Sequence, residues 1–73
     1  MLQDLLDYIA GRSVLILGFA REGRSTHRLI RKYFPDKPLA VADKNEVLLD
    51  DANTRLITGT GYLGCLDEFD LIF

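Results

Sequence analysis

The chain has 73 residues, of which 48% are hydrophobic and 27% charged, and its net charge is −2. This length allows one small domain, and the mild acidity gives no general attraction to nucleic acid or to anionic membranes. The single cysteine excludes a disulfide framework, no apolar run approaches the ~20 residues that cross a membrane, and the first ten residues lack the basic start of a secretory signal. We therefore expect a soluble cytoplasmic domain that binds neither nucleic acid nor membranes.

The first elements in the chain are a helix and a strand. The four apolar residues Leu2, Leu5, Leu6 and Ile9 recur at helical spacing, and Gly11 ends the segment. This pattern predicts a short helix that lies against a sheet. Val14 to Leu17 is an unbroken aliphatic run, too short for a helix, and it predicts a strand covered on both faces.

A glycine turn, Gly18 to Gly23, follows this strand with the spacing G-x-G-x-x-G, except that Ala20 replaces the middle glycine. In such turns the first glycine makes the tight bend, the second lets a phosphate approach the backbone, and the third lets the helix pack on the strand. We expect the methyl group of Ala20 to crowd the phosphate. Arg21 and Glu22 complete the turn.

The segment after Gly23 has the pattern of an amphipathic helix. Its apolar positions follow helical spacing and predict the face that packs on the sheet: Thr26, Leu29, Ile30 and Tyr33. The remaining large polar side chains are expected in solvent, with the basic ones suited to the helix dipole: His27, Arg28, Arg31 and Lys32.

The start of this helix predicts an anion site. Its free N–H groups point at the glycine turn, where they stabilise a negative group, and Arg21 and Arg24 flank that place. Ser25 and Thr26 lie in the first helical turn, where satisfying the helix end is a commoner role for such residues than touching a phosphate.

A second apolar run, Leu39 to Ala42, predicts another strand that ends at Asp43. Asp43 lies 20 residues after Gly23, the distance at which an acid at a strand tip commonly meets a ribose hydroxyl; its alternative role is to cap the next helix. Strand, turn, helix, strand and acid in this order predict an α/β fold: a Rossmann-like parallel sheet of three to four strands with flanking helices.

The remaining elements are short. Asn45 is expected to cap a helix over Glu46 to Asp51, and Thr54 to Thr58 predicts a third strand. Gly59 to Gly64 matches G-x-G-x-x-G in full, but only five residues separate it from the next apolar run. Since a parallel crossover needs a dozen or more residues, we predict a flexible turn with one helical turn after it.

The end of the chain predicts a fourth strand. Cys65 is expected to be a small, partly buried hydrophobe rather than a nucleophile, because no base is recognisable near it. Leu71 to Phe73 has the character of the opening of a strand, so we expect the fold to be truncated and the chain to belong to a longer protein. No pattern of paired catalytic carboxylates, metal ligands or a phosphate-binding P-loop is present, which favours binding over catalysis.

Two stretches of the chain resemble a known family. Val14 to Thr26 (VLILGFAREGRST) and Ala42 to Asn45 (ADKN) are similar to the N-terminal domain of the muramyl-peptide ligases, above all to the branch that adds D-glutamate. The resemblance covers nearly the whole chain after Gly11, and it departs from the family pattern at Ala20, where a glycine is usual.

The resemblance implies that residues 1–73 form the N-terminal UDP-binding domain of a three-domain cytoplasmic enzyme of peptidoglycan synthesis. That enzyme uses ATP and Mg²⁺ to activate the carboxylate of UDP-N-acetylmuramoyl-L-alanine for attack by D-glutamate. The implied UDP-binding residues are those of the glycine turn and the strand tip: Gly18, Ala20, Arg21, Glu22, Gly23, Asp43, Lys44 and Asn45. The ATP-binding P-loop and the catalytic residues are expected beyond Phe73, so the chain by itself should have no ligase activity.

Two other interpretations remain open, because residue chemistry alone does not separate UDP from NAD. One is the cofactor domain of an NAD(P)-dependent dehydrogenase, in which Asp43 binds the adenosine ribose and Lys44 favours a 2′-phosphate. The other is a non-catalytic domain that senses a nucleotide and regulates a transporter or channel.

Overall fold

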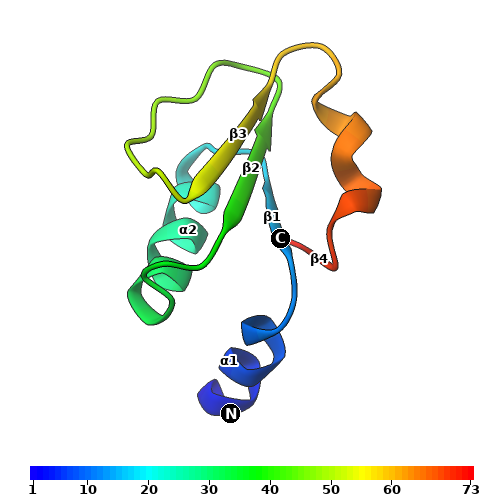
Figure 1. Ribbon diagram of the computed structural model, residues 1–73. Coiled ribbons are helices and arrows are strands. Elements are labelled where there is room, and N and C mark those ends of the chain that lie inside the picture. Colours follow the sequence, from blue (N-terminus) through cyan, green and yellow to red (C-terminus); the bar gives the residue numbers. More distant parts are fainter.

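Four parallel strands form a single sheet in the order β3-β2-β1-β4 (Figure 1). Their bounds are β1 Val14–Leu17, β2 Leu39–Asp43, β3 Thr54–Thr58 and β4 Leu71–Ile72. The computed structural model describes residues 1–73. Strand β1 is central and pairs in parallel with β2 and with β4. The predicted Rossmann-like α/β arrangement and all four predicted strands are therefore confirmed.

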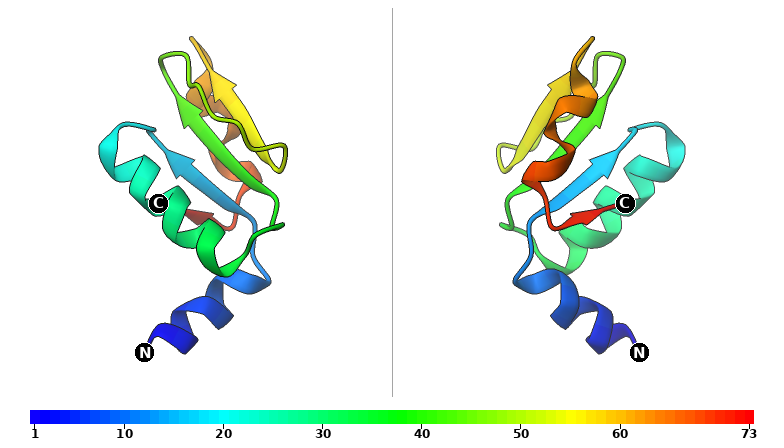
Figure 2. Two further views of the ribbon diagram at one scale, coloured as in Figure 1. Left: turned by 90° about the vertical axis from the view of Figure 1, so that its left-hand side faces the viewer. Right: turned by 90° about the vertical axis from the view of Figure 1, so that its right-hand side faces the viewer.

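Helices cover both faces of this sheet. Helix α2, Arg21–Tyr33, lies on one face, and the 3₁₀-helix η1, Tyr62–Glu68, lies on the other (Figure 2). Because successive strand residues point to opposite faces, each face has its own apolar core. The core on the α2 face contains Ile9, Val14, Ile16, Phe19, Ile30, Leu39, Val41 and Val47. The core on the η1 face contains Leu15, Ala40, Ala42 and Cys65.

Helix α2 packs on the sheet with a face that matches the prediction only in part: Ile30 is buried and Thr26 half-buried, as expected. His27 is buried, with 7% of its surface exposed, whereas Leu29 is 52% exposed and Tyr33 is also exposed. The reason lies in Gly23, which is inside the first turn of α2 and sits against the backbone of Gly18. This contact fixes the rotation of the helix, so the residues four and seven positions later, His27 and Ile30, turn inward.

Helix α1, Leu2–Ala10, is present as predicted but does not lie against the sheet. Only Ile9 of this helix is buried, while Leu2 and Leu5 are largely exposed. The helix extends away from the end of the sheet at which the strands begin (Figure 1). Its apolar stripe therefore contributes to the core only through its last turn.

The predicted helix over Glu46 to Asp51 is absent, and residues 44–53 connect β2 to β3 without a helix. Val47 is buried and Leu49 is partly buried, whereas Leu48 between them is exposed, which is the alternation of an extended segment. Because β2 and β3 are parallel, residues 44–53 must run back from the end of β2 to the start of β3, over about the length of β3. Six helical residues advance only ~9 Å, against ~17 Å for a five-residue strand, so an extended path is required.

The last third of the chain follows its prediction in part, because the helix after β3 has seven residues and begins at Tyr62, inside the predicted turn Gly59 to Gly64. The turn after β3 leads into η1, and Cys65 is buried on the sheet, with its Sγ donating to the carbonyl oxygen of Tyr62 at 3.3 Å. Strand β4 then joins β1. Just before it, the N–H of Ser13 donates to the Asp70 carboxylate at 3.0 Å, and the N–H of Asp70 lies 2.9 Å from the Ser13 hydroxyl. These bonds fix the register of β1 and β4.

Candidate functional site

The first glycine turn lies where β1 ends and α2 begins, at the edge formed by the carboxyl ends of the strands. Gly18 has φ +85°, a left-handed conformation that favours glycine. A Cβ on Gly23 would clash with the carbonyl oxygen of Gly18 and lie 3.0 Å from its carbon. The roles predicted for the first and third glycines are thus confirmed, since one makes the bend and the other lets α2 approach β1.

The N-terminus of α2 has no cap from within the chain. Its N-cap residue is Ala20, which has no side-chain oxygen, and no side chain bonds to the helix start. The N–H groups of Arg21, Glu22 and Gly23 donate to no other group, and the first bonded amide is that of Arg24, which donates to the Ala20 carbonyl oxygen at 3.0 Å. These free donors and the helix dipole favour an anion at this position.

Asp43 ties the end of β2 to this turn. One carboxylate oxygen accepts the N–H of Phe19 at 2.7 Å, and the other accepts the N–H of Asn45 at 2.8 Å. The N–H of Asn45, followed by that of Phe19, lowers the pKa of Asp43 against the opposing effect of burial. Asp43 does not cap a following helix, because no helix follows.

A hollow of about 300 Å³ opens between the turn and the tip of β2. It brings together six of the eight predicted site residues: Gly18, Ala20, Arg21, Glu22, Gly23 and Asp43. The other two lie outside it. Lys44 borders a separate hollow at the second glycine turn, and Asn45 is exposed.

Phe19 supports the turn from below and was not singled out in the sequence. Its ring is buried, meets the His27 ring edge-on with centroids 5.8 Å apart, and lies 4.7 Å from the guanidinium carbon of Arg24. The cation–π contact holds Arg24 close to the glycine turn. Ser25, by contrast, donates its hydroxyl to the Arg21 carbonyl oxygen at 3.1 Å, within the helix.

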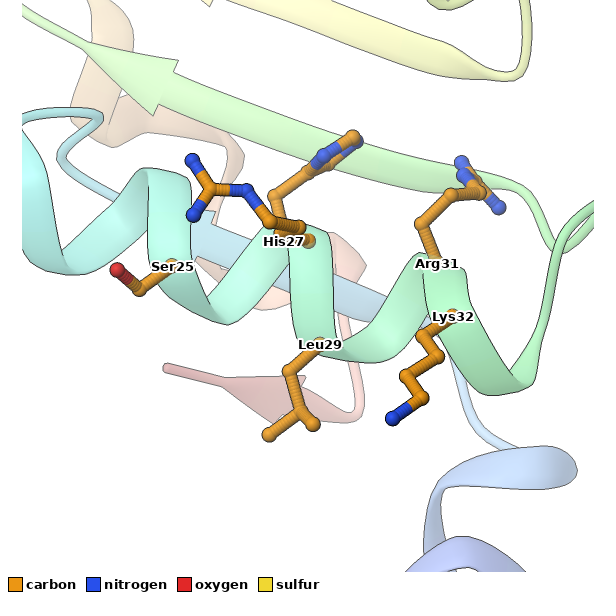
Figure 3. A pocket seen from close by; sticks show the side chains of 6 residues that line it. Ser25, His27, Leu29, Arg31 and Lys32 are labelled. Atoms are coloured by element: carbon orange, nitrogen blue, oxygen red, sulfur yellow. The ribbon is translucent and has the colours of Figure 1, made fainter.

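A second polar cluster lies between α2 and the start of β3. Arg31 donates from Nε and from a terminal nitrogen to one Asp51 carboxylate oxygen, at 3.0 and 2.8 Å, and Thr54 donates to the same oxygen at 2.7 Å. His27 Nε2 lies 3.0 Å from that oxygen and 3.0 Å from Thr54 Oγ1. His27 and Arg31 extend from the same side of α2, away from Leu29 and Lys32 (Figure 3).

The structure therefore corrects the expectation that His27 and Arg31 are solvated. Burial raises the pKa of Asp51, but bonds from Thr54, the Asn53 N–H and Arg31, together with the Arg31 charge, outweigh it and lower the pKa to about 2. Acid and hydroxyl both contact Nε2 of His27, so the ring is not placed between them as in a proton relay. The cluster holds the 44–53 segment on α2.

Arg28 and Lys32 remain solvent-exposed, as predicted, and with four other α2 residues they border an open hollow of about 660 Å³ (Figure 3).

No three His, Cys, Asp or Glu side chains are grouped so that they can hold a metal ion. None of the helices has the length and apolar character needed to cross a membrane. Searches of protein-family models, curated proteins and solved structures found no match to the chain.

Proposed function

We propose that this chain binds a nucleoside diphosphate, with the diphosphate in the hollow at the N-terminus of α2. The observation that carries the proposal is the uncapped start of α2, where three free N–H groups border a hollow built by Gly18, Gly23 and Asp43. Helix N-termini without an internal acceptor bind phosphate groups readily. Arg21 borders the same hollow and adds a full positive charge, which offsets one of the two acidic residues there, Glu22 and Asp43.

The resemblance of Val14 to Thr26 and of Ala42 to Asn45 to the muramyl-peptide ligases narrows this ligand to UDP. We propose that the chain is the domain that holds the UDP part of UDP-N-acetylmuramoyl-L-alanine in a cytoplasmic ligase that adds D-glutamate. ATP, Mg²⁺ and D-glutamate would then bind to other domains of that enzyme. An NAD(P)-binding domain and a nucleotide sensor are the competing functions.

Titration of ¹⁵N-labelled protein separates these functions. We expect UDP and UDP-N-acetylmuramoyl-L-alanine to shift the amide signals of residues 18–24 and 43–45, and NADH to leave them unchanged. A response to NADH without a response to either uridine ligand would overturn the proposal in favour of a dehydrogenase domain. Shifts confined to other parts of the chain would reject the hollow as the site.

Two arginines of α2 provide a matched pair of variants. Arg21→Ala should weaken UDP binding about tenfold, because it removes a charged donor at the diphosphate. Arg28→Ala removes an exposed arginine from the same helix but outside the hollow, and it should leave the affinity unchanged. Equal losses in the two variants would indicate a diffuse charge effect instead of a contact with the diphosphate.

A further inference from the structure

Helix α1 leaves most of its apolar stripe in solvent. Ile9 is buried in the core on the α2 face, but Leu2 and Leu5, which lie on the same side of the helix, are about half exposed. Tyr8, at the edge of the stripe, is also about half exposed. A surface helix normally packs such a stripe on another element. The first two turns of α1 therefore present an apolar face that nothing in the chain covers.

Specific contacts hold α1 in this projecting position. Arg12 donates to the Tyr8 carbonyl oxygen at 2.7 Å, and its guanidinium carbon lies 4.0 Å from the centre of the Tyr8 ring. Lys37 donates to the Ala10 carbonyl oxygen at 3.2 Å. Both bonds satisfy carbonyl groups at the C-terminal end of α1 that lack a partner within the helix. Because α1 is already anchored and ordered, it loses little conformational freedom when a partner covers its stripe.

The outer face of α2 combines exposed apolar and basic side chains. Leu29 and Tyr33 lie one helical turn apart, and both are exposed. Arg28 and Lys32 lie next to them in the chain, are exposed, and take part in none of the ion pairs of the structure. Leu29 and Lys32 extend to the same side of α2 and border the open hollow of about 660 Å³ (Figure 3). This face is therefore suited to a helix that is both apolar and acidic.

Helix α1 carries the complementary charge. Its side chains include two aspartates and no base, and Asp4 and Asp7 are both exposed. Neither takes part in an ion pair. The two aspartates are three residues apart and the two bases of α2, Arg28 and Lys32, are four residues apart, so each pair is spaced by about one helical turn. In charge and in apolar character, α1 therefore matches the outer face of α2.

We infer that two copies of this chain associate, with α1 of each copy lying on the outer face of α2 of the other. Because every copy has both faces, the contact forms twice about a two-fold axis, and the dimer is closed. Within one copy the two faces do not meet, since α1 lies beyond the C-terminal end of α2 (Figure 2). The hollow at the start of α2 stays open in the dimer, because neither Arg28 nor Lys32 borders it.

Sedimentation equilibrium at low salt measures this association. A contact made by nine-residue helices is small beside permanent interfaces, so we expect the average mass to rise from 8.3 kDa toward twice that value between about 20 µM and about 1 mM protein. Salt at about 0.5 M should weaken the association, because it screens exposed charges. A mass that stays at 8.3 kDa over the whole range would overturn the inference and leave α1 to a partner other than this chain.

Charge reversal on each helix tests which faces meet. The α1 variant combines Asp4→Lys with Asp7→Lys, and the α2 variant combines Arg28→Glu with Lys32→Glu. Each variant alone should self-associate at least about tenfold more weakly than wild type, because like charges then face each other. An equimolar mixture should associate as wild type does, since every α1 then meets an α2 of opposite charge. A mixture that stays monomeric, or a single variant that dimerises like wild type, would overturn the inference.

Two exposed acids of η1 provide the matched control. Asp67→Lys with Glu68→Lys changes the net charge by the same amount as the α1 variant, but on the opposite face of the sheet from α2, and it breaks only an exposed pair with Arg55. This control should associate like wild type. An equal loss in the control would show that net charge alone governs association, and it would reject the contact between α1 and α2. Circular dichroism should report a native fold in all three variants, because every substituted residue is exposed.

Discussion

The two glycine turns begin alike and then differ in what the chain builds after them. Gly18 and Gly59 each follow a parallel strand and have nearly the same φ, +85° and +89°. The first turn opens a 13-residue α-helix, and its last glycine, Gly23, packs against the backbone of Gly18. The second opens a seven-residue 3₁₀-helix, and its last glycine, Gly64, has open space around it.

The number of matching glycines is therefore a poor guide to the structure that follows such a turn. The second turn matches G-x-G-x-x-G completely and the first does not, yet only the first places an uncapped α-helix N-terminus over a hollow. The helix that follows and the close approach of the third glycine decide whether donors converge on an anion. The second turn leads into a 3₁₀-helix, so no α-helix N-terminus directs its N–H groups at that place.

The sharpest test of this contrast substitutes the last glycine of each turn. Gly23→Ala should lower the free energy of unfolding by about 3 kcal/mol, because its Cβ would collide with the backbone of Gly18, which cannot move aside cheaply. Gly64→Ala should change it by no more than about 0.5 kcal/mol. Urea unfolding followed by circular dichroism measures both. Similar values for the two variants would show that the turns do not differ in packing.

The next contrast concerns what holds each helix on the sheet. Asp51→Asn removes the charge that pairs with Arg31 under α2 and should cost about 2 kcal/mol of unfolding free energy. The matched change beside η1 is Glu68→Gln, which breaks an exposed pair with Arg55 at 3.4 Å and should cost at most about 0.5 kcal/mol. A larger loss for Glu68→Gln, measured in the same urea experiment, would reverse this ranking.

The sheet was predictable because its strands are short apolar runs bounded by glycine or polar residues, such as Val14 to Leu17. The glycine turn and the acid at Asp43 were also readable, since their roles depend on local spacing. The inward face of α2 was not, because it depends on the contact of Gly23 with Gly18 across the turn. Apolarity correctly placed Ile30 inside but also placed Leu29 and Tyr33 there, whereas the close approach of Gly23 turns His27 inward in their place.

The polar cluster under α2 was missed for a related reason. Its partners come from α2 and from the stretch around β3, 20 or more residues apart, and no local pattern links Arg31 or His27 to Asp51. The segment before Asp51 offered no signal in the sequence either, because Val47, Leu48 and Leu49 are three consecutive apolar residues. Only the structure shows that Val47 and Leu49 turn inward and Leu48 outward, on an extended path that brings Asp51 beneath α2.

Acid should lower the free energy of unfolding, in part because Asp51 under α2 becomes protonated. Its pKa is about 2 in the folded chain and near 3.8 when unfolded, so its stabilising effect is complete above about pH 5 and is lost as the pH falls through 4 toward 2. The loss should be about 1 to 2 kcal/mol after allowance for solvent screening.

The control for this titration is the Asp51→Asn variant. The pKa values of Asp43 and Asp70 are lowered too, chiefly by the backbone N–H groups of Asn45 and Ser13, so wild-type protein loses stability from several sources. The difference between wild type and Asp51→Asn should therefore shrink between pH 5 and pH 2. A difference that stays constant would mean that Asp51 has an ordinary pKa in the folded chain.

Asp43→Asn should change the hydrogen exchange of single amides in the first glycine turn and leave the second turn unaffected. Asn at position 43 has one carbonyl oxygen where Asp43 has two acceptors, so Asp43→Asn must release the N–H of either Phe19 or Asn45. Hydrogen exchange at that amide should become faster, and changes in amide signals should stay within residues 18–20 and 43–45. Residues 59–64 should keep their exchange rates, because Gly59 bonds to the main-chain oxygen of residue 43 and not to its side chain. The control is Asp70→Asn at the other end of β1, where a single carboxylate oxygen accepts the Ser13 N–H; it should leave both turns unchanged. If Asp43→Asn changed the amide exchange of residues 59–64 as strongly as that of residues 18–20, the side chain of Asp43 would support both glycine turns and not the first alone.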